Sequence, residues 1–195
     1  MGTERDALQE IASGDPVRYL DDPRPEVRRV AVSACAGLGS EALEALASRV
    51  AQEPDENVRA EIIEVLGRLG SDAYPHVWER RDDESTRVVE SVATALGELG
   101  DAAALPWLLG LIDNHEDVLV REAAVAALGA IGDDRALPTL LESARSGKPQ
   151  IRRRAVVALT AFEGPQVEAA LLAARLDRNP MVKEVAEGIL GRETR

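Results

Sequence analysis

The residues most able to bind a metal ion lie in one short segment, Asp113-Asn114-His115-Glu116-Asp117. Imidazole and carboxylate groups are ligands for divalent cations, so this segment is a candidate metal site. The same composition is typical of a solvated loop, such as residues 82–84 or 55–57 of this chain. A single His-Glu pair supplies too few ligands, and we therefore expect neither a metal nor a cofactor.

The sequence offers little for nucleophilic or acid–base catalysis. Cys35 is the single cysteine and falls on an apolar helical face, while His76 and His115 lie far apart in the chain. Catalysis of this kind needs groups that converge on one point. We predict that the protein is not an enzyme.

The balance of charge restricts the partners. A net charge of −12 argues against a general nucleic-acid binder, because such proteins need a basic surface. Residues 1–100 carry 21 acidic and 11 basic side chains. This excess of negative charge favours a partner protein with a basic surface, but solubility alone explains it equally well. A basic zone near residues 148–154, with Arg178 beyond it, leaves nucleic-acid binding open as an alternative function.

Arginines recur at a regular spacing and could form a binding ladder. They occupy one column, Arg28, Arg59, Arg121 and Arg152, which Lys183 continues. Val89 interrupts the column, and a continuous groove that reads charge would not contain such a gap. We therefore expect these arginines to pair with aspartates of turns or with backbone carbonyls of an adjacent repeat.

The elements that position these residues repeat along the chain. One apolar anchor recurs about every 31 residues, at Val27, Val58, Val88, Val120, Ile151 and Val182. The fourth, eighth and eleventh residues after each anchor are also mostly apolar, which is the spacing of one helical face. We predict that these first helices start close to Glu26, Asn57, Arg87, Leu119 and Gln150, and that their small residues let neighbouring repeats approach closely.

A second helix follows in each repeat after a short turn. Glycines should end the first helices at positions 39, 70, 100 and 132, and polar residues should serve turn and N-cap chemistry at Ser40, Asp72, Asp101 and Asp133. Pro75, Pro106 and Pro138 must lie in the first turn of the second helices, where the missing N–H costs nothing.

The segment Val120–Leu140 carries almost the whole repeat pattern, Val-Arg-x-x-Ala-x-x-Ala-Leu-Gly-x-Ile-Gly-Asp-x-x-Ala-Leu-Pro-x-Leu. It resembles HEAT repeats of the phycobilin-lyase (PBS-lyase) type, and the resemblance covers roughly residues 24–192. The fold class implied is all-α: an armadillo-like α-solenoid of about five helix–turn–helix repeats with half-repeat caps. We expect a single domain over residues 1–195, with an N-terminal cap at 1–23, five repeats at 24–179 and a C-terminal cap helix at 180–195.

The resemblance also raises three activities that can be compared with the residues. Deoxyhypusine hydroxylases place iron-binding His-Glu pairs in the first helices, but the matching positions here are Arg29, Ala60, Glu90, Glu122, Arg153 and Glu184. HEAT-like DNA glycosylases use a basic groove with aromatic residues, for which only the basic zone is a candidate. A phycobilin-lyase-like or other small-ligand-handling protein stays open as an alternative function, although no residue set marks a pocket.

The two tryptophans differ in the column they occupy. Trp78 aligns with Leu109 and Leu141, which indicates a core position, whereas Trp107 points the opposite way and shares an outward face with Leu111. In HEAT arrays the second helices line the concave surface. We predict that Trp107 and Leu111 form the centre of a partner-binding strip on this surface. The flanking members of the strip are His76, Arg80, Thr139 and Ser143.

The ends of the array should be capped. Residues 3–13, with Thr3-x-x-Asp6, suit a capping helix at the start, and at the other end Glu187 and Glu193 make polar a face that is apolar at Val125 and Val156. No apolar run reaches membrane-spanning length, and the start lacks the apolar core of a signal peptide. We predict a cytoplasmic scaffold or adaptor that binds another protein on its concave face, without a membrane, a nucleic acid or a small-molecule ligand.

Overall fold

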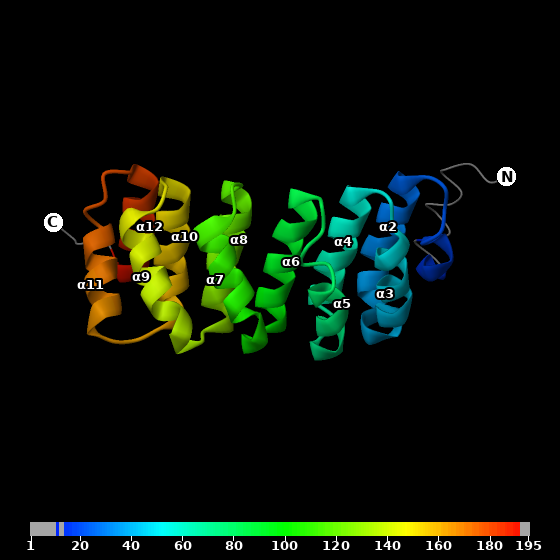
Figure 1. The fold of residues 1–195 in the computed structure, drawn as a ribbon, viewed down its shortest axis with the longest axis horizontal. Helices are drawn as coiled ribbons and strands as arrows, with labels where there is room; N and C mark the ends of the chain where they lie inside the picture. Colours follow the sequence, from blue (N-terminus) through cyan, green and yellow to red (C-terminus); the bar gives the residue numbers. More distant parts are fainter. Residues whose placement is uncertain (1–10, 12–13, 192–195) are drawn as a thin grey trace. The chain divides into compact units, whose positions relative to one another are not determined.

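The computed structural model describes Ile11 and residues 14–191, and every regular element among them is a helix. The chain divides into two compact units, residues 1–99 (unit 1) and 100–195 (unit 2), and each is described by itself. The capping helix expected at residues 3–13 falls almost wholly outside the described residues, as does Glu193. The all-α prediction is confirmed (Figure 1).

Unit 1 alternates first and second helices. Its first helices are α2 (Pro25–Cys35), α4 (Glu56–Gly67) and α6 (Thr86–Leu99), and its second helices are α3 (Leu43–Gln52) and α5 (Tyr74–Trp78). Short 3-10 turns precede α2, α3 and α5, at Pro16–Tyr19, Ala36–Ala42 and Ser71–Ala73. Helix α4 packs between α2 and α6, with α3 and α5 along one side (Figure 1).

Unit 2 continues the same alternation. Its first helices are α8 (Val118–Ile131), α10 (Pro149–Ala158) and α12 (Pro180–Leu190), and its second helices are α7 (Leu105–Asn114), α9 (Leu137–Ser146) and α11 (Pro165–Ala174). Three 3-10 turns accompany them, at Ala102–Ala104, Asp134–Ala136 and Leu159–Ala161. Helix α10 packs between α8 and α12, and α9 contacts both α10 and α11.

The first helices begin one residue before the positions expected from the sequence, and in two of them the added residue is proline, Pro25 or Pro149. Proline is favoured there because its fixed φ suits a first turn whose N–H groups have no partner. Pro75, Pro106 and Pro138 likewise lie in the first turns of α5, α7 and α9, as predicted.

Glycines with positive φ follow the first helices. Gly132 takes the left-handed conformation and ends α8, and its N–H bonds the carbonyl of Leu128. Gly100, which directly follows α6, also has positive φ, so the predicted stop is confirmed there as well. Gly39 and Gly70 have positive φ too, but α2 and α4 have already ended at Cys35 and Gly67, so these two glycines turn the chain after the helix. Gly39 (φ 58°) interrupts the continuous helical stretch Pro25–Gln52, whose length and mean hydropathy of 1.3 would otherwise suit a membrane span. The two helices on either side have 11 and 10 residues, too few to cross a bilayer.

The polar residues after these glycines serve as caps in two of the four repeats. Asp101 and Asp133 each accept a hydrogen bond from the N–H two residues further on. The prediction is wrong for Ser40 and Asp72, because Ser40 lies inside the 3-10 turn and Gly70 occupies the N-cap position before Ser71–Ala73.

The first helices supply much of the core, and second-helix residues such as Leu46, Leu108 and Leu140 complete it. The anchor residues and the residues four positions on are at most 5% exposed in all six repeats. The eighth position is fully buried from Cys35 to Leu159. The eleventh position departs from the prediction at Leu38, which is 36% exposed because α2 has already ended at Cys35.

The last helix carries the polar face expected of a terminal repeat. Val125 and Val156 are fully buried, whereas the side chain of Glu187 keeps 35% of its surface exposed and pairs with Lys183 at 3.7 Å. Charge at this position is tolerated because no further helix among the described residues packs over it.

Two glycines set the spacing between first helices. A Cβ atom on Gly67 would lie 2.7 Å from the Cβ of Ala95 in α6, and one on Gly129 would lie 2.6 Å from the Cβ of Ala158 in α10. Both distances are shorter than carbon atoms tolerate, so helices α4 and α6, and likewise α8 and α10, approach closely only because these residues lack side chains.

We therefore expect Gly129→Ala to lower the free energy of unfolding by about 1–3 kcal/mol, because α8 and α10 must separate or distort. The matched control is Gly188→Ala in α12, where a Cβ meets nothing within 4 Å and the better helix former should stabilise by roughly 0.5–1 kcal/mol. Urea denaturation of the three proteins measures both effects. Equal stability changes in the two variants would contradict the close approach.

Candidate functional site

Three arginines of the predicted column are buried against a carboxylate at the end of the same repeat. Arg28, Arg59 and Arg152 project from α2, α4 and α10 to acids 24 or 25 residues further on. Each pair makes two parallel hydrogen bonds, at 2.8 and 2.6 Å to Glu53, 3.1 and 3.0 Å to Asp83, and 2.8 and 2.7 Å to Asp177. We call each such pair an Arg–carboxylate clasp. The structural role expected for these arginines is confirmed.

The clasp has two further hydrogen bonds that tie it to backbone. The Nη1 of the arginine donates to a carbonyl of the preceding loop, as Arg28 does to Asp22 and Arg152 to Gly147. The acid accepts the N–H two residues further on, as Glu53 does from Asp55 at 2.9 Å. The clasp therefore connects the loop before a repeat, its first helix and the loop after it.

The clasps shift the ionisation of their members. Burial acts to raise the pKa of Glu53, but hydrogen bonds from Arg28, from the N–H of Asp55 and from Arg49 outweigh it, so that this pKa lies below its usual value. The hydrogen bonds from Arg152 lower the pKa of Asp177 despite burial. Both carboxylates are thus held ionised at neutral pH.

Arg121 of α8 occupies the same column without a carboxylate partner. Its Nε atom is fully buried and makes no hydrogen bond to the described residues, the one such side-chain atom among them. Beside it lies a cavity of ≈ 370 Å³ between α7, α8, α9 and the start of α10. Two residues of the predicted binding strip, Thr139 and Ser143, line this cavity together with Lys148.

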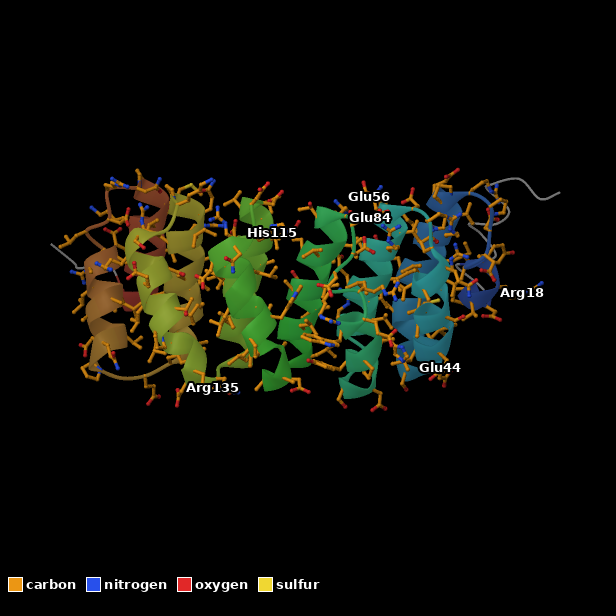
Figure 2. All side chains as sticks on the ribbon, in the orientation of Figure 1. Arg18, Glu44, Glu56, Glu84, His115 and Arg135 are labelled. Atoms are coloured by element: carbon orange, nitrogen blue, oxygen red, sulfur yellow. The ribbon has the colours of Figure 1, made fainter. Side chains whose placement is uncertain are left out.

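The candidate metal segment is a capped loop between α7 and α8 (Figure 2, His115). The Nδ1 of His115 accepts the N–H of Asp117 at 3.1 Å, and the carboxylate of Asp117 accepts the N–H of Leu119. These side chains terminate helices. No three His, Cys, Asp or Glu side chains converge as metal ligands within residues 14–191 or at Ile11.

Cys35 is fully buried in the core of unit 1. Burial raises the pKa of its thiol to about 11, and the charge of Asp15 acts in the same direction. A neutral thiol without access to solvent is a poor nucleophile, so Cys35 is a core residue.

The residues of the predicted strip are exposed to different extents. Trp107 and Leu111 of α7 and Thr139 of α9 are all half-buried, and Ser143 is only 7% exposed. The prediction of an outward Ser143 is wrong, because this small side chain lies in the wall of the cavity among residues of α7, α8 and the start of α10. His76 and Arg80 belong to unit 1, where both are half-buried.

Trp78 is not the core residue that its column predicted. It is half-buried, stacks on Tyr74 with ring centroids 5.9 Å apart and carries the guanidinium of Arg81 4.6 Å above its ring. Leu109 and Leu141 of the same column are half-buried as well, because the preceding residues, Val77, Leu108 and Leu140, are the ones that point into the core. The stacked ring and the guanidinium stabilise Trp78 near the surface.

A second hollow follows the second helices of unit 2 and was not expected from the sequence. It has a volume of ≈ 480 Å³ and lies between α9 and α11. Its walls are mainly small apolar residues, Leu141, Ala144, Ala169, Ala170, Ala173 and Ala174. The alanine-rich sequence of α11 could have indicated this groove, but the same alanines equally suit a closely packed helix.

Ion pairs neutralise part of the basic zone. Arg152 is only 4% exposed and belongs to a clasp, while Arg153 and Arg154 both approach Glu122 of α8, at 3.3 and 3.1 Å. The zone therefore presents less positive charge than the sequence suggested.

Comparison with known proteins agrees with this architecture. The family model of HEAT repeats matches residues 16–96 and 77–160. The chain therefore belongs to the HEAT-repeat family. No curated protein sequence matches it significantly.

Solved structures show the same fold at low sequence identity. The chain is similar to the complex of CpcE and CpcF of phycocyanin lyase from Nostoc sp. PCC7120, with 23% identity, a TM-score of 0.71, and 90% of this chain and 74% of that chain covered. It is also similar to the Escherichia coli protein YibA, with 15% identity, a TM-score of 0.66 and coverage of 95% and 74%. The PBS-lyase-like HEAT fold is thus confirmed, while identities this low carry no activity across.

We expect Arg28→Ala to destabilise unit 1 by roughly 3 kcal/mol, because it leaves the fully buried carboxylate of Glu53 with fewer donors. The neighbouring Arg29→Ala removes an exposed pair with Glu61 at 3.7 Å and should cost less than about 1 kcal/mol. Chemical denaturation measures both. A cost for Arg28→Ala no larger than for Arg29→Ala would show that the clasp is not structural.

The clasps also predict a loss of stability in acid. A carboxyl group whose pKa is lower in the folded state contributes stability that is fully present above its unfolded pKa, about 4, and is lost as the pH falls through the folded value. Unfolding free energy should therefore stay level from pH 7 to about 5 and fall below about 4. The fall should be smaller in Arg152→Met, whose Asp177 has lost the donors that lower its pKa. Urea denaturation at about pH 7 and about pH 3 tests this, and an identical fall in both proteins would contradict it.

Proposed function

We propose that this HEAT-repeat chain is a non-enzymatic scaffold or adaptor that binds another protein along its second helices, in the cytoplasm. The non-enzymatic part of the proposal is supported by the described polar groups. Cys35 is buried, and the side chains of the His115 loop and of the clasps form hydrogen bonds within the protein. In the Nostoc phycocyanin lyase, CpcE and CpcF form a complex, which is consistent with protein pairing as a use of this fold.

The observation that carries this proposal is the pair Trp107 and Leu111. They lie four residues apart in α7, so they share one helical face, and both keep part of their surface exposed. Aromatic side chains make up 3% of the sequence, and an accessible indole is the largest apolar contact such a surface can offer. The groove between α9 and α11 adds further apolar surface in unit 2 for side chains of the partner.

The flanking residues are proposed to modulate this contact. Within unit 2, Thr139 and Ser143 would add polar contacts, although Ser143 is reachable only from the cavity. His76 and Arg80 are proposed to contact the partner from unit 1.

A basic partner is consistent with the acidic loops at one end of unit 1. The negative charges of Glu56 and Glu84 both contribute to the raised pKa of Arg59, and the two residues lie at the same end of the unit (Figure 2). Asp82 is exposed and only loosely paired with Arg81 at 3.4 Å, so it can act in encounter, whereas Asp83 is held by Arg59.

Two other functions receive less support. Nucleic-acid binding would need the basic zone, but Arg152, Arg153 and Arg154 are paired with acids. A phycobilin-lyase-like role would need a large tetrapyrrole site, and the two cavities described in unit 2 are small and partly lined by charged groups. Handling of a smaller ligand is favoured by one specific observation at Arg121, which is developed below.

We expect Trp107→Ala to weaken partner binding by about 2 kcal/mol or more, since an interface anchor loses its buried area. Its thermal unfolding midpoint should change little. The test is affinity capture from the native host, followed by a binding titration of the captured partner against both proteins.

Site-specific crosslinking adds a control. A photoreactive amino acid at Leu111 should crosslink the partner, whereas the same group at Leu119, which is 52% exposed at the start of α8, should not. Equal crosslinking at both positions, or unchanged affinity in Trp107→Ala, would place the interface elsewhere.

A further inference from the structure

We propose that unit 2 contains a carboxylate-binding site, formed by Arg121 in the cavity beside it. This inference goes beyond the scaffold function and does not rest on it. The site takes the place of an Arg–carboxylate clasp whose acid is missing from the chain.

The missing acid is identified by position. Glu53, Asp83 and Asp177 each lie five residues before the next anchor, at Val58, Val88 and Val182. The same position before the anchor Ile151 is Ser146. Its hydroxyl is engaged with Glu142, at 3.1 Å to the carbonyl and 2.7 Å to the carboxylate.

In the other repeat that lacks a clasp, both the arginine and the acid have been replaced. The third repeat has Val89 at the arginine position and His115 at the acid position. That repeat therefore keeps neither half of the pair. Arg121 with Ser146 is different, because the arginine has been kept while its acid has gone.

The geometry around Arg121 suits an incoming carboxylate. Its Nε is fully buried without a partner among the described residues, and the cavity of ≈ 370 Å³ opens beside it. In the complete clasps this nitrogen and Nη2 donate to the two oxygens of one carboxylate. Once a rotation of the Arg121 side chain turns its Nε toward the cavity, a ligand carboxylate would accept the same two bonds, which is the arrangement guanidinium groups favour.

A third donor is also available. In the complete clasps the acid accepts the N–H two residues further on, from Asp55, Ser85 or Asn179. The equivalent residue here is Lys148, which lies in the loop between α9 and α10 and lines the cavity. Its N–H and its ammonium group both favour an anion.

The remaining walls define the class of ligand. Ile112, Pro138 and Ile151 supply apolar surface, while Asp113 and Glu142 add negative charge. Glu142 is occupied by Arg145 at 2.6 Å and by Ser146. A second negative charge on the ligand would be repelled, so the site fits a monocarboxylate with a short apolar tail better than a phosphate or a dicarboxylate.

The test is a titration of the ¹⁵N-labelled protein with butyrate, followed by NMR through the Arg121 Nε–H resonance. We expect a saturable shift in the millimolar range, a much smaller one with inorganic phosphate, and none with butyramide, which has the same tail without the charge. A shift that does not saturate, or an equal shift with butyramide, would overturn the proposal.

Two variants report on the site from opposite directions. Arg121→Gln removes the guanidinium, and Ser146→Asp supplies the internal acid that the three complete clasps have. Both should abolish butyrate binding, which is followed through the backbone N–H signals of the cavity. Ser146→Asp should also raise the thermal midpoint by completing the clasp. Arg135→Gln, an exposed arginine paired with Asp133, is the matched control and should bind like wild type. Butyrate binding that persists in either cavity variant would refute the assignment.

A carboxylate can come from a small acid or from an Asp or Glu side chain of a protein. A terminally blocked peptide with one Glu, compared with its Gln counterpart, separates these sources. Binding of the Glu peptide at least tenfold tighter than butyrate would assign the site to an acidic protein segment, and weaker binding would assign it to small organic acids. If the scaffold proposal is wrong, Trp107→Ala will not weaken partner binding, whereas the butyrate titration will give the same result.

Discussion

The interaction on which the repeat depends most is the buried Arg–carboxylate clasp. Two charges can be removed from water only when each has enough hydrogen-bond partners, and the clasp meets this condition at both ends. Arg28 bonds both oxygens of Glu53 and a carbonyl of the preceding loop, while Glu53 also accepts from Arg49 and from the N–H of Asp55. Since these groups belong to two loops and two helices, their positions become mutually dependent. Apolar contacts fill the core, and the clasp fixes which loop lies over which helix.

The apolar columns and the glycines complement this constraint. The columns are built from Val, Ala and Leu and would tolerate some sliding of one helix along another, because apolar contact has little directionality. Gly67 and Gly129 allow contact at one point only, where Ala95 or Ala158 faces them. Directional hydrogen bonds in the three clasps and a steric fit at these two glycines therefore determine register together.

Much of the fold could be predicted from sequence because its signals are local and repeated. An anchor about every 31 residues, a glycine after most first helices and a proline early in several second helices are each readable within a few residues, and the copies reinforce one another. The site was less predictable, because exposure depends on the rotation of each second helix about its axis. Ser143 forms part of a cavity wall where its column indicated an outward position, and Trp78 is half-buried, like Leu109 and Leu141, where their column indicated core. The three acid partners were visible in the sequence, five residues before the anchors Val58, Val88 and Val182. Their pairing with arginines 24 or 25 residues away becomes clear only in the folded structure.

Departures from a repeated structural interaction carry functional information that single residues do not. A lone arginine beside a cavity has many explanations, most of them unrelated to binding. Arg121 is more informative because three equivalent arginines show what its position requires, two acceptors held in one plane, and because Ser146 cannot supply them. The repeat thus provides its own reference state, in which the partner of this arginine is a carboxylate. A solenoid can acquire a ligand site in this way by losing one internal acid, since the neighbouring repeats continue to hold the helices that form its walls.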